Sequence, residues 1–121
     1  MPVEHTARAR DVLGLEPVLA VEQTALMGMD AGEARSFARA WAEGYLDLPN
    51  YARNWHRLGY DPVDGLDRLI DAAFVWGSAE EVMVRVRAHL DAGADHVCIQ
   101  VLSGEQPDTC LPQLRELFSA L

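Results

Sequence analysis

The feature that most limits what this chain can fold into is a helix-to-strand unit in residues 78–102. Ser78 and Glu81 have the spacing of a capping box, so we predict a helix over residues 79–91. A short turn of small residues leads from this helix into the apolar run 97–102, which predicts a strand. A capped helix that passes through a short turn into an apolar strand is typical of the parallel sheets of α/β proteins.

Both elements of this unit are predicted to bury apolar side chains. The helix is expected to bury Val82, Met83, Val86 and Leu90. Two sets of side chains alternate along the strand, with Val97, Ile99 and Val101 on one face and Cys98 and Leu102 on the other. Because both sets are apolar, both faces need cover. We therefore interpret Cys98 as a packed core thiol rather than a nucleophile.

The rest of the chain is predicted to be mostly helical, with one further strand over residues 18–27. A second capping box, at Asp30 and Glu33, begins an amphipathic helix whose apolar stripe runs from Ala34 to Tyr45. The other helices are expected over residues 4–13, 50–58, 62 to about 77, and 111–120. The sequence therefore predicts an α/β fold of mostly helices with two short parallel strands.

Length, charge and missing motifs exclude several classes of protein. With 121 residues the chain suffices for one domain, whereas a complete (β/α)8 barrel takes roughly 250 residues. The formal net charge of −9 would repel phosphate groups, which argues against a general nucleic-acid binder. The sequence has no lysine to form a Schiff base, no glycine-rich nucleotide motif, no run of 18 apolar residues and no secretion signal. We therefore expect a cytoplasmic protein.

Three stretches of the chain, taken in order, carry a resemblance to a known family. They are residues 4–10 with Leu13-Gly14 and Glu22-Gln23; residues 44–46 with 48–51, Asn54 and 57–60; and residues 67–77 continuing through 92–97. In this order they resemble the C-terminal part of the luciferase-like monooxygenase family. Within the family they look most like the oxidoreductases that use the deazaflavin coenzyme F-420.

The resemblance implies a partial (β/α)8 barrel, in which residues 1–121 form a single C-terminal fragment with the last two β/α units. Members of the family transfer a hydride between a deazaflavin or flavin cofactor and an organic substrate, so the chain is expected to belong to such an enzyme. Earlier strands of the barrel supply much of the cofactor site. We therefore expect the isolated chain to be inactive and to bind coenzyme F-420, or alternatively FMN, weakly or not at all.

Barrel sites lie at the carboxyl ends of the strands, so Gln23 and Gln100 are the predicted cofactor contacts. Gln100 is the polar interruption of an apolar strand, although a core glutamine with satisfied hydrogen bonds would give the same pattern. Ser103 and Gly104 follow at the exit of that strand and would line the same site or form a simple turn. Glu22 adjoins Gln23 and is a weaker candidate for the same role.

The predicted substrate contacts are Asn50, Asn54 and Arg57, which lie at helical spacings of 4 and 3 and share one face of a helix. That face would contact the substrate or an anionic group, or would be an ordinary solvated face above packed aromatic side chains. No metal site is predicted, because His89 and His96 lie on different elements and the cysteines match no zinc pattern.

Two kinds of function stay open. The chain is part of a luciferase-like oxidoreductase, or it is a non-catalytic remnant that acts as an oligomerising interaction module. Strands taken out of a barrel expose edges and an apolar layer, so we predict a homo-oligomer or a complex with a complementary barrel fragment. A small-molecule substrate is expected where the barrel is complete.

Overall fold

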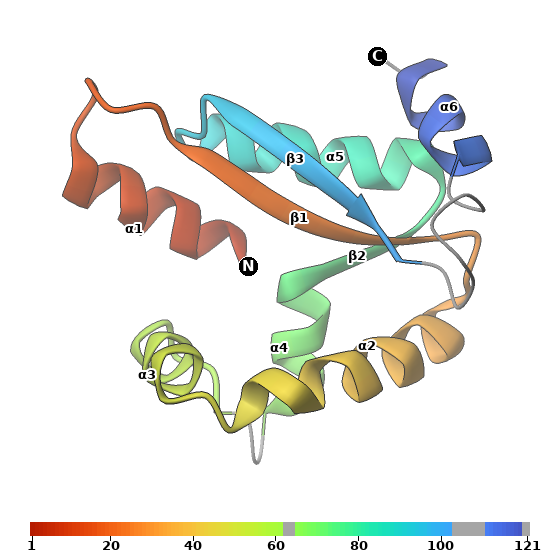
Figure 1. The fold of residues 1–121 in the computed structure, drawn as a ribbon, viewed down its shortest axis with the longest axis horizontal. Coiled ribbons are helices and arrows are strands. Elements are labelled where there is room, and N and C mark those ends of the chain that lie inside the picture. Colours follow the sequence, from red (N-terminus) through yellow and green to blue (C-terminus); the bar gives the residue numbers. More distant parts are fainter. Residues whose placement is uncertain (62–64, 103–110, 120–121) are drawn as a thin grey trace.

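Three parallel strands form the centre of the computed structural model, which describes residues 1–61, 65–102 and 111–119 (Figure 1). The elements follow one another as α1 (Val3–Leu13), β1 (Ala20–Met27), α2 (Ala31–Leu46), α3 (Pro49–Arg57), α4 (Leu66–Ala73), β2 (Phe74–Gly77), α5 (Ala79–Asp91), β3 (His96–Val101) and α6 (Leu111–Ser119). The predicted α/β class and the excess of helix are therefore confirmed. Within these ranges no helix is both long and apolar enough to cross a membrane.

The first strand along the chain is the central strand of the sheet. In the order β2-β1-β3, Thr24 of β1 pairs with Phe74 on one side and with Gln100 on the other. The two predicted strands thus pair in parallel as expected. Consecutive strands of a barrel lie side by side, which would put β2 between the other two. The described residues form an open sheet instead, with β2 and β3 as its edge strands.

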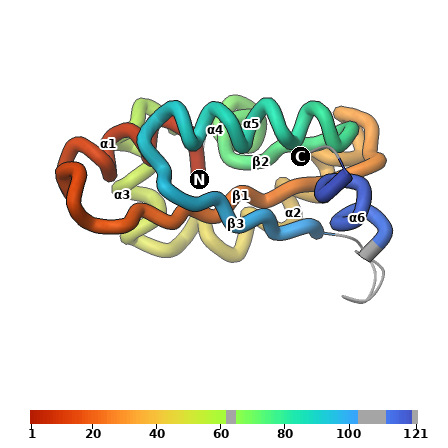
Figure 2. The backbone as a smooth tube through the Cα atoms, turned by 90° about the horizontal axis from the view of Figure 1, so that it is seen from above, coloured from red at the N-terminus to blue at the C-terminus, as the bar shows by residue number. Residues whose placement is uncertain are grey.

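Helices cover the two faces of this sheet unequally. α5 lies along one face, with α6 at one end of it (Figure 2). The buried residues of that layer are Ala25, Met27, Val75, Ala79, Val82, Met83, Val86 and Leu117. On the other face α2 and α4 form a second cluster that contains Leu26, Ala34, Ala38, Ala42, Ile70 and Phe74. This second cluster includes no residue of β3, so one side of β3 is left exposed.

An aromatic cluster attaches α3 to the rest of the fold. Trp55 and Tyr60 are buried together with Leu69 of α4. The Tyr60 hydroxyl also donates to the Glu4 carboxylate of α1, with 3.3 Å between the two oxygens. α3 is therefore held against both α1 and α4.

Both predicted capping boxes are present. The Asp30 carboxylate accepts a hydrogen bond from the backbone N–H of Glu33 at 2.9 Å, and the Ser78 hydroxyl accepts one from Glu81 at 3.3 Å. In return, the Glu81 carboxylate accepts from the backbone N–H of Ser78 at 2.8 Å, which lowers the pKa of Glu81. α2 and α5 accordingly begin at the predicted residues.

Arg10 ties the end of α1 to the turn before β3. Its guanidinium donates to the carbonyl oxygens of Gly93 and Gly14, at 2.8 and 2.7 Å. It also pairs with Asp95, whose carboxylate accepts from the backbone N–H of Leu19 at 2.8 Å. Those two contacts lower the pKa of Asp95, with the backbone hydrogen bond as the larger cause. This clamp holds the first residues of β1 beside β3.

The prediction of a helix over residues 62 to about 77 is wrong for the last part of that range. α4 ends at Ala73, and Phe74–Gly77 form β2, a third strand that the prediction of two strands did not include. Aromatic and β-branched residues at positions 74–76 favour a strand, and the φ of 103° at Gly77 is incompatible with a helix. Pro62, where that helix was expected to start, lies outside the described residues.

Two predictions of burial are also wrong. On α5 the last buried position is His89, which is fully buried, whereas Leu90 is 44% exposed. Cys98 is exposed rather than packed, because none of the helices in the described ranges covers its side of β3. The other side of that strand packs against the α5 layer as predicted, through Val97, Ile99 and Val101.

Removal of the Ser78 cap is expected to destabilise the fold. In Ser78→Ala the backbone N–H of Glu81 loses its acceptor, so the free energy of unfolding should fall by about 1 kcal/mol in a urea titration followed by circular dichroism. Ser36→Ala is the matched control, because Ser36 is exposed in the middle of α2 and should change stability by less than about 0.5 kcal/mol. Equal losses in the two variants would contradict the capping role.

Candidate functional site

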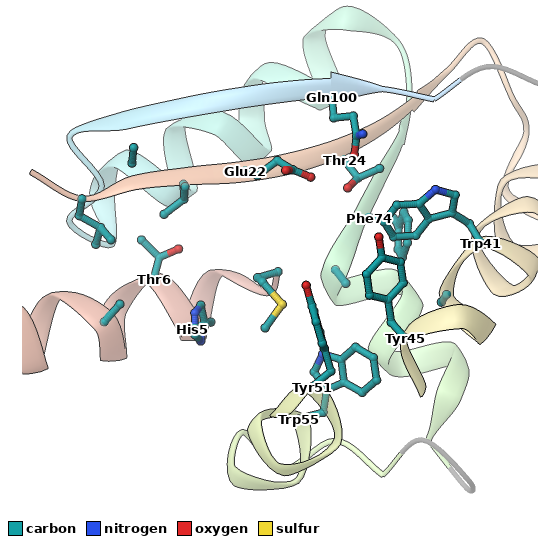
Figure 3. A pocket seen from close by; sticks show the side chains of 17 residues that line it. His5, Thr6, Glu22, Thr24, Trp41, Tyr45, Tyr51, Trp55, Phe74 and Gln100 are labelled. Carbon is teal, nitrogen blue, oxygen red and sulfur yellow. The ribbon is translucent and has the colours of Figure 1, made fainter. Parts of the chain in front are cut away.

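A pocket of about 390 Å³ lies between the less covered face of the sheet and helices α1, α2 and α3 (Figure 3). All three strands contribute to its lining, β2 through Phe74 and β3 through Gln100. The volume falls in the range of pockets that hold small organic molecules. The pocket is therefore the candidate functional site among the described residues.

Five aromatic side chains form a continuous wall of this pocket: Phe74, Trp41, Tyr45, Tyr51 and Trp55. Trp41 stacks on Tyr45 with 4.7 Å between ring centroids and meets Phe74 edge to face at 5.7 Å. Tyr51 contacts Tyr45 at 5.1 Å and Trp55 at 5.6 Å. We call this set the aromatic wall. It offers broad apolar surface on which a planar molecule can lie.

The sheet presents three polar side chains opposite the aromatic wall. Glu22 and Thr24 are two residues apart on β1 and so project to the same side of the strand. Thr24 pairs in register with Gln100 of β3, and Figure 3 shows all three side chains directed toward the pocket. Glu22 is the single carboxylate among the described lining residues, which include no arginine.

His5 of α1 and Met1, which precedes that helix, close another side of the pocket. The Asn54 side-chain amide of α3 donates to Nδ1 of His5 at 3.2 Å. Burial lowers the pKa of His5, so its ring is neutral at pH 7. Burial also lowers the pKa of the Met1 α-amino group, while attraction to the Glu22 carboxylate opposes that change. An unpaired charge is therefore disfavoured in this part of the pocket.

Trp55 carries an unsatisfied polar atom. Its side chain is only 5% exposed, and the indole Nε1–H has no hydrogen-bond partner among the described residues. A buried donor without an acceptor costs free energy, and native proteins contain few of them. Because Trp55 lines the pocket, an acceptor atom of a bound molecule would satisfy this N–H.

Gln23 points away from the pocket, into a buried hydrogen-bond network. Nε2 of His89 lies 2.8 Å from the Gln23 side-chain oxygen, and Nδ1 of His89 lies 2.8 Å from the Thr6 hydroxyl. The Gln23 amide donates to the carbonyl oxygens of Thr24 and Ala73, at 2.8 and 3.1 Å. Since an amide oxygen only accepts, the proton of the neutral ring is on Nε2 and the Thr6 hydroxyl donates to Nδ1. The network joins α1, β1, α4 and α5.

The two predicted cofactor contacts thus lie in different surroundings. Gln100 is exposed on β3 and lines the pocket, whereas Gln23 is fully buried and its side chain is held by the His89 network. Ser103 and Gly104 lie outside the described residues. Contact of either glutamine with a cofactor stays a prediction.

The predicted substrate contacts on α3 lie beside the pocket. Asn50 and Arg57 are exposed and do not line it, and Asn54 reaches it through His5. The same helix instead sends Tyr51 and Trp55 into the aromatic wall. Their role in substrate binding stays a prediction as well.

Sequence reasoning did not identify Trp41 and Phe74 as pocket residues, because it placed each of them within a predicted helix. For Trp41 the sequence holds a signal of its place at the pocket, because the buried positions of α2 are the alanines at 34, 38 and 42. A helix that packs through alanines lies too close to its neighbours to bury a large ring on the same line. Trp41 and Tyr45 therefore project at the side of the contact, where they line the pocket.

Neither a metal cluster nor a known relative identifies the chemistry of this site. Among the described residues no group of three or more His, Cys, Asp or Glu side chains is placed to hold a metal ion. Comparison of the chain with protein-family models, with curated proteins and with solved structures finds no match.

The His89 network is expected to make stability depend on pH. Burial lowers the pKa of His89 from 6.5 to about 4, so between these values the unfolded chain binds a proton that the folded chain does not. The free energy of unfolding should therefore decrease as the pH falls from 6.5 to 4, by up to about 3 kcal/mol. Urea titrations at several pH values measure this.

The variant His89→Gln, which carries no titrating ring, should lose this part of the pH dependence. His56→Gln is the control, because His56 is exposed on α3 and should leave the pH profile unchanged. A profile that is equally steep in His89→Gln and in the unmodified chain would show that another group causes the acid sensitivity.

Proposed function

We propose that this chain is the C-terminal part of a luciferase-like oxidoreductase and that its pocket forms one side of the organic substrate site. The observation that carries the proposal is the aromatic wall, which faces polar side chains of the sheet across a cavity of about 390 Å³. Substrate pockets are mostly apolar and aromatic, with a few polar groups that fix orientation. The sequence resemblance supplies the class of reaction, hydride transfer to or from an organic molecule.

Two features of the sheet support a larger assembly. In the part of the chain that the structure describes, β2 and β3 each have one unpaired edge, and the side of β3 that carries Cys98 and Gln100 is exposed. In a closed barrel the edges are paired and side chains on one side of each strand fill the interior. The barrel order also requires β2, which is four residues long, to lie between β1 and β3.

The pocket does not fit a complete molecule of coenzyme F-420 or FMN. Both cofactors carry phosphate, whereas the described lining residues include the Glu22 carboxylate and no arginine to bind it. We therefore assign the pocket to the substrate. The cofactor supplies the redox chemistry in such enzymes, and the part of this chain is to bind the substrate and exclude water.

The isolated chain is expected to bind coenzyme F-420 and FMN weakly or not at all in a fluorescence titration. Riboflavin, which has the flavin ring but no phosphate, is the matched ligand and should bind no worse than FMN, because the pocket repels the phosphate. A dissociation constant below about 1 μM for either cofactor would contradict the proposal, since tight binding requires an enclosed site that this chain lacks.

One observation favours the second candidate function, an oligomerising module. Four large apolar side chains are exposed close together at the end of α1 and before β1: Val12, Leu13, Leu15 and Val18. Exposed apolar groups of this kind mark surfaces that bind another protein chain. We propose that they, together with the edges of β2 and β3, bind a second copy of the chain or a complementary barrel fragment.

Light scattering is expected to give a mass of at least two chains of 13.4 kDa each. Val18→Ser should lower the fraction of oligomer, because Val18 is 78% exposed in the proposed surface. Val84→Ser is the control, since Val84 is 60% exposed on α5, outside that surface, and should leave the mass unchanged. A stable monomer that binds no hydrophobic dye at about 100 μM would contradict this proposal.

A further inference from the structure

We propose that the pocket binds a neutral, planar, bicyclic nitrogen heteroaromatic molecule, which directs two adjacent N–H groups at the Glu22 carboxylate. The inference deepens the proposed function and rests on it for the assignment of the pocket to a substrate. It names the chemical class of that substrate from the side chains that surround it.

The shape of the ligand follows from the aromatic wall. Its rings contact one another in series at centroid distances of 4.7–5.7 Å, so they form an extended surface rather than separate patches. The cavity of about 390 Å³ has room for two fused rings beside this surface. Stacking on Trp and Tyr favours a planar aromatic ligand over an aliphatic one.

We infer the two N–H groups of the ligand from the Glu22 carboxylate, which can accept them. Its carboxylate makes no side-chain hydrogen bond among the described residues, and Figure 3 shows it directed into the pocket beside Thr24. Two carboxylate oxygens accept a pair of parallel N–H donors in a bidentate arrangement. Glu22 already attracts the α-amino group of Met1, so its charge acts on groups inside the pocket.

The neutrality of the ligand follows from burial. Desolvation is the main cause that lowers the pKa of His5, and its Nδ1 already accepts from the Asn54 amide at 3.2 Å, so this side of the pocket offers no partner to a charged ligand. An anionic ligand would also meet the negative charge of Glu22. A neutral molecule avoids both penalties and still donates charge-assisted hydrogen bonds to the carboxylate.

Trp55 provides an independent indication of a ligand. Trp55 lines the pocket, and its indole N–H is buried and has no acceptor among the described residues. A heteroaromatic molecule with a carbonyl oxygen or an unprotonated ring nitrogen supplies that acceptor. The same ligand thus satisfies a donor on α3 and a carboxylate on β1.

The probe for the test is 2-amino-4(3H)-quinazolinone, a neutral bicyclic molecule with an amino group next to a ring N–H and a carbonyl acceptor. Its control is 4(3H)-quinazolinone, which lacks the amino group. Each is titrated into the ¹⁵N-labelled chain, and the indole N–H signal of Trp55, identified by its loss in Trp55→Phe, reports contact with the wall. We expect a dissociation constant of about 1 mM or below for the probe and about tenfold weaker binding of its control.

Variants test the carboxylate directly. Glu22→Gln keeps the size of an exposed side chain, so it should fold normally and bind the probe about tenfold more weakly. Glu16→Gln removes the same charge from an exposed residue outside the pocket and should bind like the unmodified chain. The proposal is overturned by the absence of a saturable change in the Trp55 signal, by equal binding of the two probes, or by equal binding to Glu22→Gln.

The outcome also separates this inference from the proposed function. Selective binding of the probe would support the proposed class of ligand. If hydride transfer is nevertheless absent once the missing barrel half and coenzyme F-420 or FMN are supplied, the proposal that the chain belongs to an oxidoreductase is overturned. Turnover by the completed barrel, with no binding of the probe to it, would overturn the ligand class alone.

Discussion

The buried ring of His89 holds together four segments that are distant in the sequence, and the geometry of the site depends on it. The ring accepts from Thr6 of α1 and donates to Gln23 of β1, and Gln23 in turn donates to the carbonyl oxygen of Ala73 at the end of α4. Side chains alternate along a strand, so fixing Gln23 toward α5 directs Glu22 and Thr24 the other way. The polar side of the pocket is thus set by a hydrogen-bond network on the opposite face of the sheet.

Small residues set the other side of the pocket. The buried face of α2 consists of Ala34, Ala38 and Ala42, which lets the helix approach the sheet closely. The large rings of the same helix cannot fit into that contact and lie at its margin, where they meet Phe74 and the rings of α3. The aromatic wall therefore follows from the close packing of α2. Trp41, Tyr45 and Tyr51 keep part of their surface exposed, whereas Trp55 and Phe74 are only 5% exposed.

Features that depend on a few neighbouring residues could be predicted from the sequence, whereas features that depend on tertiary contacts could not. The two capping boxes placed the starts of α2 and α5, and the apolar runs placed β1 and β3. β2 was missed because its four residues are too few to show a period of two against a helical stripe. His89 was missed because a polar residue on a helix is buried only when another element supplies its partners. Gln100 was placed in a site from its strand position alone, whereas the aromatic wall depends on how α2, α3 and β2 pack together.

The central place of β1 also sets the order in which the chain can fold. Gln23 has its partners 50 and 66 residues further along, at Ala73 and His89, so the sheet forms only after most of the chain has been made. Contacts of such sequence separation close slowly because a long loop must be ordered first. At a synthesis rate of about 5–20 residues per second, β1 leaves the ribosome several seconds before either neighbouring strand. During that interval a strand meant for the middle of the sheet has both edges unpaired, and unpaired strand edges are prone to pair with other chains.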